Sequence, residues 1–304
     1  MSFIQPLVSV GICTYNAEVK IVQTLDSVFN QSYQNIEIFV LDDCSTDNTF
    51  NVIKLWAINK TNVVVLKNKI NLGVVKNCNI LLTYFTGKFF QFLGHDDIIF
   101  PDKIYSQIDL LRKTNYDAAL VFSDVQTIDE ENKLLSLSYL NNHGYNVENF
   151  PLHDLTGELL KFNFIPSISV LLSLKLVKEL GGYDESIALE DLYMWLKLST
   201  TNTFLFQPHV TGQYRIVQSS MMHNINSRIS ILASTLELRE RYRGFNTSWD
   251  NIINEGIKKS APAIYRYNKK KGKLWLKTRL LHDKSIKSYL YRIMSVFKIG
   301  YFWK

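Results

Sequence analysis

The amino-acid sequence predicts an α/β protein with a mostly parallel sheet and helices on both of its faces. Between residues 7 and 122, short apolar runs rich in β-branched residues alternate with stretches whose apolar residues recur at helical spacing. This alternation is typical of parallel strands joined by helices. The 304 residues, of which 46% are hydrophobic and 20% charged, suffice for one large globular domain or for one domain with a helical appendage.

The first part of the chain predicts buried strands separated by helices. Strands are expected where apolar residues run together, at 7–12, 36–41, 63–66, 89–93 and 118–122. Helical spacing is found at 21–29, 50–58 and 74–84, and Asp47 or Thr46 is available to cap the second of these helices. Pro101 suits the first turn of a further helix that runs to about Arg112.

The second part of the chain is less regular. A hairpin around Glu131 and Asn132 is expected at 128–135, followed by a long polar loop at 136–154. A strand at 168–172 precedes a short helix that Gly181 and Gly182 end. The remaining expected elements are a helix at 190–198, short strands at 203–206 and 209–214, and a helical pattern from Met221 to the end of the chain.

The cysteine count and the hydropathy pattern exclude several classes of protein. Cys13, Cys44 and Cys78 are odd in number and widely spaced, so they predict neither a disulfide framework nor a zinc site, but small buried side chains in a reducing compartment. No secretory signal is visible, and the apolar segment 162–174, which contains Pro166, is too short to span a bilayer. The expectation is a cytoplasmic protein that is soluble or peripheral to a membrane.

The net charge of +6 conceals an uneven distribution. Residues 258–304 contain 14 lysines and arginines and a single acid, Asp283, so this segment carries +13 while the rest of the chain carries −7. Bulky apolar residues from Trp275 to Trp303 lie among the bases, a mixture that suits an anionic membrane surface. A helix packed on the body with a solvated basic face explains the segment nearly as well. Nucleic acid is not expected as a partner, because no recognition motif is present.

Polar residues follow the predicted strands at the edge where ligands of parallel α/β sheets bind. The candidate binding loops are those at 13–18, 42–47, 68–73 and 94–100. The first contains Tyr15, whose ring can stack on a flat base, although an exposed turn explains it as well. In the second, Asp42 and Asp43 repel each other and require compensation, which a uracil N3–H or a ribose hydroxyl can provide. Helix capping explains Asp47 but neither member of this pair.

Two further acid pairs follow in the sequence. Asp96 and Asp97 lie after the fourth predicted strand, where carboxylate oxygens suit Mg²⁺ or Mn²⁺ and leave positions open for phosphates. The alternative for this pair is capping of the helix near Pro101. Glu190 and Asp191 begin a predicted amphipathic helix, where the helix dipole favours acids, and the functional alternative is a general base.

These residues belong to a set of separate motifs that recur in a fixed order. The motifs are Thr14-Tyr15-Asn16, Leu25-x-Ser27-Val28, Gln31-x-Tyr33, Glu37-Ile38, Asp42-Asp43-x-Ser45-x-Asp47, Asn71-x-Gly73, Asn79, Asp96-Asp97 with Pro101, Phe122-Ser123-Asp124, Gly181-Gly182-Tyr183-Asp184-Glu185, Glu190-Asp191 and Tyr214-Arg215. In these motifs the chain resembles the family 2 glycosyltransferases of the GT-A fold over roughly residues 6–220. An ordered set of this kind is far more specific than any single match.

The resemblance implies an enzyme that moves a sugar from a nucleotide sugar, most often a UDP-sugar, and inverts the anomeric configuration. By motif position, the nucleotide-binding residues are Thr14, Tyr15, Asn16, Asp42, Asp43, Asn71, Gly73, Lys76 and Asp96. Among these, Asp43 is implied to hold uracil, and Asp96 with Asp97 to ligate the Mn²⁺ or Mg²⁺ that bridges the diphosphate. Asp191 is implied to deprotonate the acceptor hydroxyl, and Glu190 to bond the acceptor or the backbone.

Three positions depart from the family pattern. Gly94 stands where the family's metal motif usually begins with an acid. Cys78 stands where an arginine is frequent, and Lys76 is the substitute that the sequence offers. Val217 stands where a histidine is common, with His223 nearby in the next segment.

The resulting prediction is a GT-A catalytic domain at 1–220 and a helical, basic extension at 221–304. The expected partners are a nucleotide-sugar donor and a glycan or glycolipid acceptor, in surface polysaccharide or glycolipid synthesis on the inner face of the cytoplasmic membrane. One alternative is a sugar-phosphate nucleotidyltransferase, although residues 13–20 lack the Gly-rich basic loop that such enzymes use. The other alternative is a non-catalytic nucleotide-sugar-binding protein.

Overall fold

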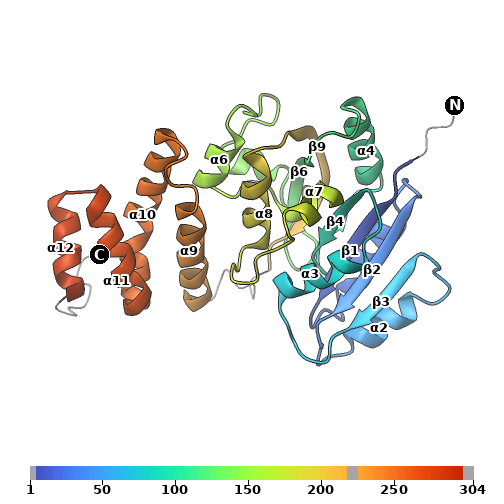
Figure 1. Cartoon of the computed structure of the whole chain (residues 1–304). Coiled ribbons are helices and arrows are strands. Elements are labelled where there is room, and N and C mark those ends of the chain that lie inside the picture. Colours follow the sequence, from blue (N-terminus) through green and yellow to red (C-terminus); the bar gives the residue numbers. More distant parts are fainter. Residues whose placement is uncertain (1–4, 218–224, 297–304) are drawn as a thin grey trace. The chain divides into compact units, whose positions relative to one another are not determined.

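The computed structural model describes residues 5–217 and 225–296, and within these ranges nine strands form one sheet (Figure 1). The strands are β1 (Val8–Thr14), β2 (Ile36–Asp42), β3 (Val63–Lys67), β4 (Phe89–Leu93), β5 (Ile98–Ile99), β6 (Leu120–Ile128), β7 (Leu134–Ser136), β8 (Leu171–Ser173) and β9 (Phe204–Arg215). Their order is β3-β2-β1-β4-β8-β6-β9-β5, and β7 pairs with β6 in the predicted hairpin.

The parallel part of the sheet consists of the first four predicted strands. β2 and β4 flank β1 in parallel, and β3 lies parallel beyond β2. Beyond β4 the direction changes, because β8 is antiparallel to both β4 and β6, whereas β9 runs parallel to β6. Parallel strands end on the same side, so the loops that follow β1, β2 and β4 leave the sheet at one edge. The predicted α/β fold with a mostly parallel sheet is confirmed.

Helices connect the strands and make up the C-terminal part of the chain. They are α1 (Ile21–Phe29), α2 (Thr49–Trp56), α3 (Val74–Tyr84), α4 (Lys103–Lys113), α5 (Tyr139–Asn142), α6 (Leu155–Lys161), α7 (Leu174–Glu179), α8 (Glu190–Ser199), α9 (Ile225–Glu240), α10 (Thr247–Tyr267), α11 (Lys269–His282) and α12 (Ile286–Val296). α1 and α3 have the predicted bounds. α4 begins two residues after Pro101, in agreement with a proline near its start.

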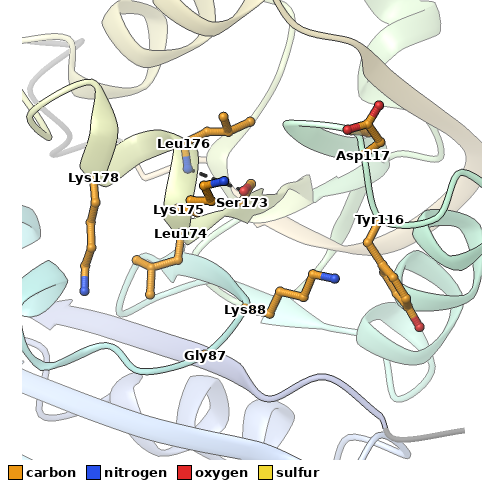
Figure 2. A pocket seen from close by; sticks show the side chains of 10 residues that line it. Gly87, Lys88, Tyr116, Asp117, Ser173, Leu174, Lys175, Leu176 and Lys178 are labelled. Carbon is orange, nitrogen blue, oxygen red and sulfur yellow. Dashed lines mark hydrogen bonds between the residues drawn. The ribbon is translucent and has the colours of Figure 1, made fainter.

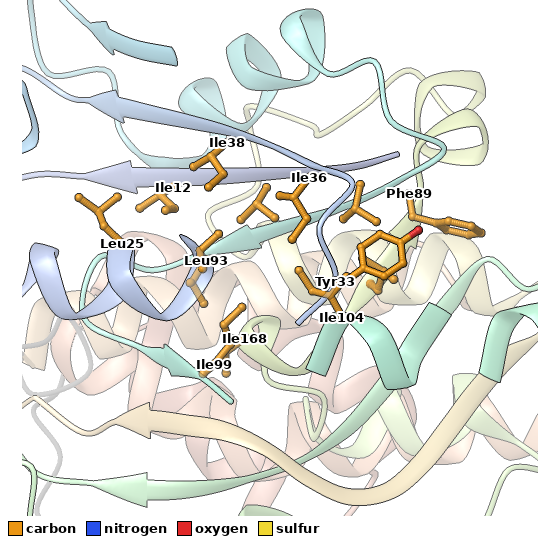
Figure 3. Packing of buried hydrophobic residues seen from close by; sticks show 14 of the residues in the cluster. Ile12, Leu25, Tyr33, Ile36, Ile38, Phe89, Leu93, Ile99, Ile104 and Ile168 are labelled. Atoms are coloured by element: carbon orange, nitrogen blue, oxygen red, sulfur yellow. The ribbon is translucent and has the colours of Figure 1, made fainter. Parts of the chain in front are cut away.

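The hydrophobic core lies where α1 and α4 pack against the parallel strands (Figure 3). Ile12 of β1 and Leu93 of β4 contribute from the sheet, while Leu25 and Ile104 contribute from the two helices. Ile12, Leu25 and Ile104 have no exposed surface. Complete burial of such a side chain stabilises the fold by about 1.5–3 kcal/mol. Packing of this kind fixes the strand ends from which the candidate binding loops leave.

The second half of the chain differs from the prediction in detail. A 3₁₀ turn at Ser167–Ser169 occupies the start of the strand expected at 168–172, so β8 is short and begins at Leu171. One long strand, β9, replaces the two short strands expected at 203–206 and 209–214. The expected loop at 136–154 contains the single turn of α5. The short helix before Gly181 and Gly182 ends as predicted, with φ of 82° and 74° at the two glycines.

The chain divides into two compact units, which are described separately. One unit contains the sheet and comprises the chain up to His153 together with Phe164–Ser186 and Met194–Val217. The other comprises Asp154–Asn163, Ile187–Tyr193 and the described part of the chain after Val217, including α9 to α12. The predicted C-terminal helices are confirmed for residues 225–296. The parts of that prediction at 221–224 and 297–304, with His223, lie outside the described residues.

Two expectations from the sequence concern the burial of the cysteines and the crossing of a bilayer. Cys78 is buried as expected, whereas Cys13 and Cys44 are only half-buried. Of the helices in the described ranges, none combines the length and the apolar character needed to cross a bilayer.

Candidate active site

The loops after β1, β2 and β4 lie next to one another at the carboxyl edge of the sheet. Thr14, the last residue of β1, is the register partner of Asp42 at the end of β2. On the other side of β1, Ile12 pairs with Leu93, which immediately precedes the loop of Asp96. The structure therefore brings together the nucleotide and metal residues that the sequence predicts in this unit.

Side-chain hydrogen bonds join the first two loops. Asn16 Oδ1 accepts from Thr46 N at 2.9 Å, and Asn16 N donates to Ser45 Oγ at 3.0 Å. Asp47 Oδ1 accepts from Thr49 N at 3.0 Å, so the predicted contact of Asp47 with the start of α2 is present, although Asn48 occupies the cap position. Asn16, predicted to line the base, thus holds the two loops together.

Thr14 and Asp42 leave polar atoms unpaired at this edge. Thr14 is 2% exposed and Asp42 is fully buried, yet in the described chain Thr14 Oγ1 and Asp42 Oδ1 have no hydrogen-bond partner. The other oxygen, Asp42 Oδ2, accepts from Ser45 N at 3.1 Å and lies 3.8 Å from Lys67 Nζ. An unpaired buried polar group costs about 1–3 kcal/mol. An orphaned hydroxyl and an orphaned carboxylate oxygen are groups that a ligand with both donors and acceptors can satisfy.

Asp43 anchors the loop at 68–73. Its Oδ1 accepts from Asn68 Nδ2 and Leu72 N, and its Oδ2 from Gly73 N, each at 2.8 Å. Burial acts to raise the pKa of Asp43, but these donors outweigh it and hold the pKa below its ordinary value. Gly73 adopts a φ of +81°, a left-handed conformation that glycine takes without strain. The sequence did not anticipate this anchoring, and the uracil contact of Asp43 stays a prediction.

The remaining predicted nucleotide residues of this edge are open to solvent. Asn71 lies in the loop that Asp43 anchors, and its side chain is exposed. Lys76 is exposed in the first turn of α3. Tyr15 is 41% exposed, so its ring is accessible for stacking.

The carboxylates of Asp96 and Asp97 converge on Gly94. A Cβ atom at Gly94 would lie 3.0 Å from Asp96 Oδ1 and 3.2 Å from Asp97 Oδ2. A side chain at position 94 would therefore crowd both carboxylates in this arrangement. Asp97 is 4% exposed and its Oδ1 accepts from Arg215 N at 2.9 Å. Burial, and next the neighbouring charge of Asp96, raise the pKa of Asp97 well above its ordinary value.

The donor chemistry of this acid pair fits a divalent cation of the Mg²⁺ type. Asp96 and Asp97 offer hard carboxylate oxygens, the ligands that Mg²⁺ and Mn²⁺ prefer. Across residues 5–217 and 225–296 there is no cluster of three or more histidine, cysteine or acidic side chains that could hold a metal alone. Mg²⁺ is commonly bound by one or two carboxylates together with substrate phosphates and water. The pair therefore fits a cation that arrives with a diphosphate.

Arg215 holds the acid loop in place, a role that the sequence did not reveal. The side chain is 3% exposed, and its Nε donates to the carbonyl oxygen of Asp96 at 2.8 Å. Its Nη1 donates to the carbonyl of Asp129 at 2.7 Å, and its Nη2 to Asn132 Oδ1 at 2.8 Å. The guanidinium thus ties the loop of Asp96 to the β6–β7 hairpin. The available signal was the Tyr214-Arg215 motif, which gave a position but no contact.

The acid pair at the start of α8 belongs to the second unit. Asp191 Oδ1 accepts from Leu192 N at 2.6 Å, and Asp191 Oδ2 accepts from Asn163 Nδ2 at 2.8 Å. Burial raises the pKa of Asp191 in spite of these two donors. Burial and the charge of Asp191 raise the pKa of Glu190 to about 8. The two acids are coupled, so the ionisation of one disfavours the ionisation of the other.

Asn163 is a second residue that the sequence did not single out. Its amide nitrogen holds Asp191, while its Oδ1 is buried and has no partner within the described residues. An asparagine 28 positions away in the chain gives no periodic or motif signal, so only the structure could reveal the pair. The contact fixes the orientation of the carboxylate that the family position assigns to catalysis.

The pocket shown in Figure 2 lies at the opposite edge of the sheet. Gly87 and Lys88 precede β4, Tyr116 precedes β6, and Ser173 ends β8, so these residues mark the edge away from the acid loops. The pocket has a volume of about 460 Å³, and no predicted site residue lines it. Lys88 Nζ lies 4.1 Å from the centre of the Tyr116 ring, a cation–π contact that occupies part of this surface. The pocket is thus separate from the candidate active site.

Comparison with known proteins agrees with the geometry of the strand-end loops. A model of the family described as glycosyl transferase family 2 matches residues 9–168, more than half of the chain. The chain belongs to glycosyl transferase family 2. The resemblance inferred from the ordered motifs is thereby confirmed.

Several relatives carry the same family name or activity. An uncharacterized glycosyltransferase from Haemophilus influenzae is 29% identical over 225 residues, which cover 72% of this chain and 69% of that protein. UDP-Glc:alpha-D-GlcNAc-diphosphoundecaprenol beta-1,3-glucosyltransferase WfgD from Escherichia coli is 28% identical over 220 residues, which cover 72% of this chain and 80% of WfgD. Other relatives are longer, and the match covers 38% of an uncharacterized glycosyltransferase from Rickettsia felis.

Solved structures share the fold at low sequence identity. The crystal structure of Staphylococcus aureus TarS residues 1–349 in complex with UDP has a TM-score of 0.62 and 15% identity, over 96% of this chain and 90% of that one. The mannosyltransferase PcManGT from Pyrobaculum calidifontis, in complex with GDP-Man and Mn²⁺, has a TM-score of 0.64 and 14% identity, over 98% and 88%. The predicted GT-A fold is confirmed.

The predicted class of enzyme, a glycosyltransferase, is confirmed at the level of the family. Neither a nucleotidyltransferase nor a non-catalytic binding protein finds support among these relatives. The comparisons assign no sugar, acceptor or stereochemical course to this chain.

Proposed function

We propose that the chain transfers a hexosyl or N-acetylhexosaminyl group from a nucleoside diphosphate, preferentially UDP, to an acceptor hydroxyl with inversion at the anomeric carbon. One observation carries the proposal. In a family 2 chain, the loop of Tyr15, the pair Asp42–Asp43 and the pair Asp96–Asp97 meet at the carboxyl edge of one sheet. The catalytic domain is proposed to span residues 1–220, and residues 221–304 to form the basic extension.

The loops after β1 and β2 are assigned to the nucleotide. Tyr15 is accessible for stacking on the base, and the unpaired Thr14 Oγ1 and Asp42 Oδ1 supply a donor and an acceptor beside it. TarS binds UDP and PcManGT binds GDP-Man, so this fold accommodates either base. Uracil is favoured here because of the motif position of Asp43. The anchored loop at 68–73, with Asn71, is assigned to the ribose, and Lys76 to the diphosphate.

The diphosphate is assigned to Asp96 and Asp97 through a divalent cation, Mn²⁺ or Mg²⁺. When bound, the cation neutralises the negative charge that grows on the departing diphosphate. Arg215 is assigned an indirect contribution: it fixes the backbone of Asp96 and is not assigned a contact with the donor. The convergence of the two carboxylates on Gly94 supports this assignment.

Asp191 is assigned the role of general base in a single displacement. Its carboxylate takes the proton of the acceptor hydroxyl while the hydroxyl oxygen forms a bond to the anomeric carbon. The bond from that carbon to the diphosphate oxygen breaks, and its electron pair leaves with the diphosphate. The donors Asn163 Nδ2 and Leu192 N favour the ionised carboxylate that the base requires. Glu190, protonated near neutral pH, can donate a hydrogen bond to the acceptor.

The acceptor is proposed to be a glycan or a glycolipid at the inner face of the cytoplasmic membrane. WfgD, which matches most of this chain, is named for a sugar linked to diphosphoundecaprenol. A lipid-linked sugar of that class is therefore the first acceptor to test, in a surface polysaccharide or glycolipid pathway.

The proposal is tested by donor binding and donor hydrolysis with added Mn²⁺. A panel of UDP-sugars, with GDP-mannose for comparison, is screened for protection against thermal unfolding. A bound donor at about 100 times its dissociation constant adds about 2.7 kcal/mol to the unfolding free energy. We expect at least one UDP-sugar to protect the chain and to be hydrolysed slowly in the presence of Mn²⁺. Protection by GDP-mannose alone would reassign the base, and absence of protection by every sugar nucleotide would reject the proposal.

A further inference from the structure

The last described helix, α12, turns its polar side toward the neighbouring helix and its apolar side toward solvent. Ser288 and Ser295 are 1% and 0% exposed, whereas Ile286 is 81% exposed and Leu290 is 52% exposed. The amphipathic helices of a globular protein bury the apolar stripe and expose the polar one. α12 departs from this arrangement, because its buried residues are Ser288, Tyr291 and Ser295, whereas Ile286, Leu290, Ile293 and Val296 are exposed.

A buried charged network fixes α12 in this orientation. Arg279 of α11 is 4% exposed and its Nε donates to Ser288 Oγ at 2.8 Å. Ser288 Oγ in turn donates to Asp283 Oδ2 at 2.6 Å, and Arg279 Nη2 lies 3.3 Å from the same oxygen. The guanidinium also lies 4.9 Å from the centre of the Tyr291 ring. Rotation of α12 to bury its apolar side would remove Ser288 and the Tyr291 ring from a buried arginine, which is unfavourable.

The exposed side of α11 combines apolar and cationic residues. Leu274 and Leu281 are 60% and 66% exposed. Lys270 and Lys277 are exposed at helical spacing with them, so all four side chains share one face. From residue 269 to 296 the sequence contains nine lysines and arginines and one acid, Asp283, which is already engaged with Arg279.

We propose that the exposed faces of α11 and α12 dock on an anionic lipid surface. Apolar side chains at the acyl boundary and lysines at the headgroups are the two features that hold amphipathic helices on such membranes. Two copies of this surface carry charge of the same sign and repel each other, so charge complementarity favours anionic lipid over self-association. The sequence predicted only that the basic C-terminal segment suits an anionic membrane. The structure indicates which residues of that segment would contact the lipid. It does not depend on the proposed transfer reaction, because lipid binding is measured without turnover.

The experiment measures binding of the full chain to phospholipid vesicles by co-sedimentation. Phosphatidylcholine vesicles with about one third phosphatidylglycerol are compared with phosphatidylcholine alone. We expect binding only to the anionic vesicles. The double variant Ile286→Ser with Leu290→Ser should weaken that binding by at least about tenfold, because both side chains lose their insertion into the lipid.

A matched double variant controls for the loss of exposed apolar surface as such. Leu55 and Ile58 are 68% and 57% exposed in the sheet-containing unit, and their replacement by serine should leave vesicle binding unchanged. Thermal unfolding of each variant verifies that it folds, and Lys270→Glu with Lys277→Glu tests the charge separately. Equal binding by wild type and the Ile286/Leu290 variant, or equal binding to neutral and anionic vesicles, would overturn the proposal. A wild-type dimer that this variant converts to a monomer would overturn it as well.

Discussion

Two pairs of adjacent aspartates lie at the same edge of the sheet, and they differ in the hydrogen bonds that the chain donates to them. In the loop after β2, Asp43 accepts three hydrogen bonds and its pKa lies below the ordinary value. In the loop after β4, Asp97 accepts one from Arg215 N, and its pKa lies well above the ordinary value because of burial and the charge of Asp96. The first carboxylate is used to shape the protein. The second pair has no equivalent set of donors from the chain, so the charged form of Asp97 is disfavoured at the place where a cation and a diphosphate are proposed to bind.

The third acid pair, in the other unit, resembles the second. Asp191 has two donors, yet burial raises its pKa, and the pKa of Glu190 rises to about 8. Acids whose charged forms are disfavoured cluster at functional sites. The comparison therefore separates Asp43, whose carboxylate is satisfied by donors of the chain itself, from two acid pairs that lack such compensation and are proposed to act on a ligand.

The largest effect is expected from Asp191→Asn. The amide cannot take the proton of the acceptor hydroxyl, so turnover should fall by about 10²–10⁴-fold while UDP binding persists. Transfer to an acceptor is measured with a saturating donor, and thermal unfolding with UDP reports binding. Turnover equal to that of the wild type would remove Asp191 from the catalytic role.

The next largest effect is a loss of stability, and it tests whether Asp43 anchors the loop at 68–73. In wild type, Leu72 N and Gly73 N each donate to a carboxylate oxygen of Asp43. Asp43→Asn replaces one of these oxygens by an amide nitrogen, which cannot accept a hydrogen bond. The unpaired donors should lower the free energy of unfolding by about 1–3 kcal/mol. Urea denaturation without nucleotide measures this loss. A variant as stable as the wild type would show that the loop at 68–73 does not depend on Asp43.

The pH dependence of the unfolding free energy tests the raised pKa of Glu190 in the third acid pair. Folded Glu190 keeps its proton up to about pH 8, but in the unfolded chain it ionises near its ordinary pKa of 4.5. Between these values the folded chain binds more protons, so the unfolding free energy contributed by Glu190 falls as the pH rises. Glu190→Gln removes this pH-dependent fall. The gain in unfolding free energy of the variant over wild type should therefore be larger at pH 8 than at pH 5, by on the order of 2 kcal/mol. A stability difference that is the same at both pH values would contradict the raised pKa of this acid.

The smallest effect is expected from Asn163→Ala. Asp191 loses a donor that stabilises its ionised form, so the pKa of Asp191 rises further. The base must be ionised, and the acid limb of the kcat/KM profile should therefore move to higher pH, with a loss of about tenfold below the limb and little loss above it. A purely structural role for Asn163 would lower kcat/KM equally at every pH, and that profile would reject the positioning role.

Periodic and local signals predicted the fold well. α3 and β4 have the bounds that apolar spacing gave, because each is one continuous segment with its own local pattern of apolar residues. β5 was not predicted, since two residues carry no periodicity, and it exists only through pairing with β9. The 3₁₀ turn at Ser167–Ser169 was likewise invisible, because Gln91 and Gln107, distant in the sequence, bond its backbone carbonyls.

The candidate site was predicted as a set of positions and not as a set of contacts. Motif order identified Asp96 and Asp191, but it could not show that Arg215 fixes the loop of Asp96 or that Asn163 holds Asp191. Both contacts join residues far apart in the chain, and their partners are backbone atoms or single side chains. Such long-range pairs leave no pattern in one sequence, so only the folded chain reveals them.

The most direct test of the account is Mn²⁺ binding at the acid pair of the β4 loop. Isothermal titration of Mn²⁺ in the presence of UDP is compared for wild type, Asp96→Asn and Asp109→Asn. Asp109 is a partly exposed acid of α4 that pairs with Arg112, so its change is a matched control. The account predicts that wild type and Asp109→Asn bind Mn²⁺ in the presence of UDP. Asp96→Asn should lose this Mn²⁺ binding, although it should be as stable to unfolding as wild type. Unchanged Mn²⁺ binding in Asp96→Asn would contradict the assignment of this pair to the donor diphosphate.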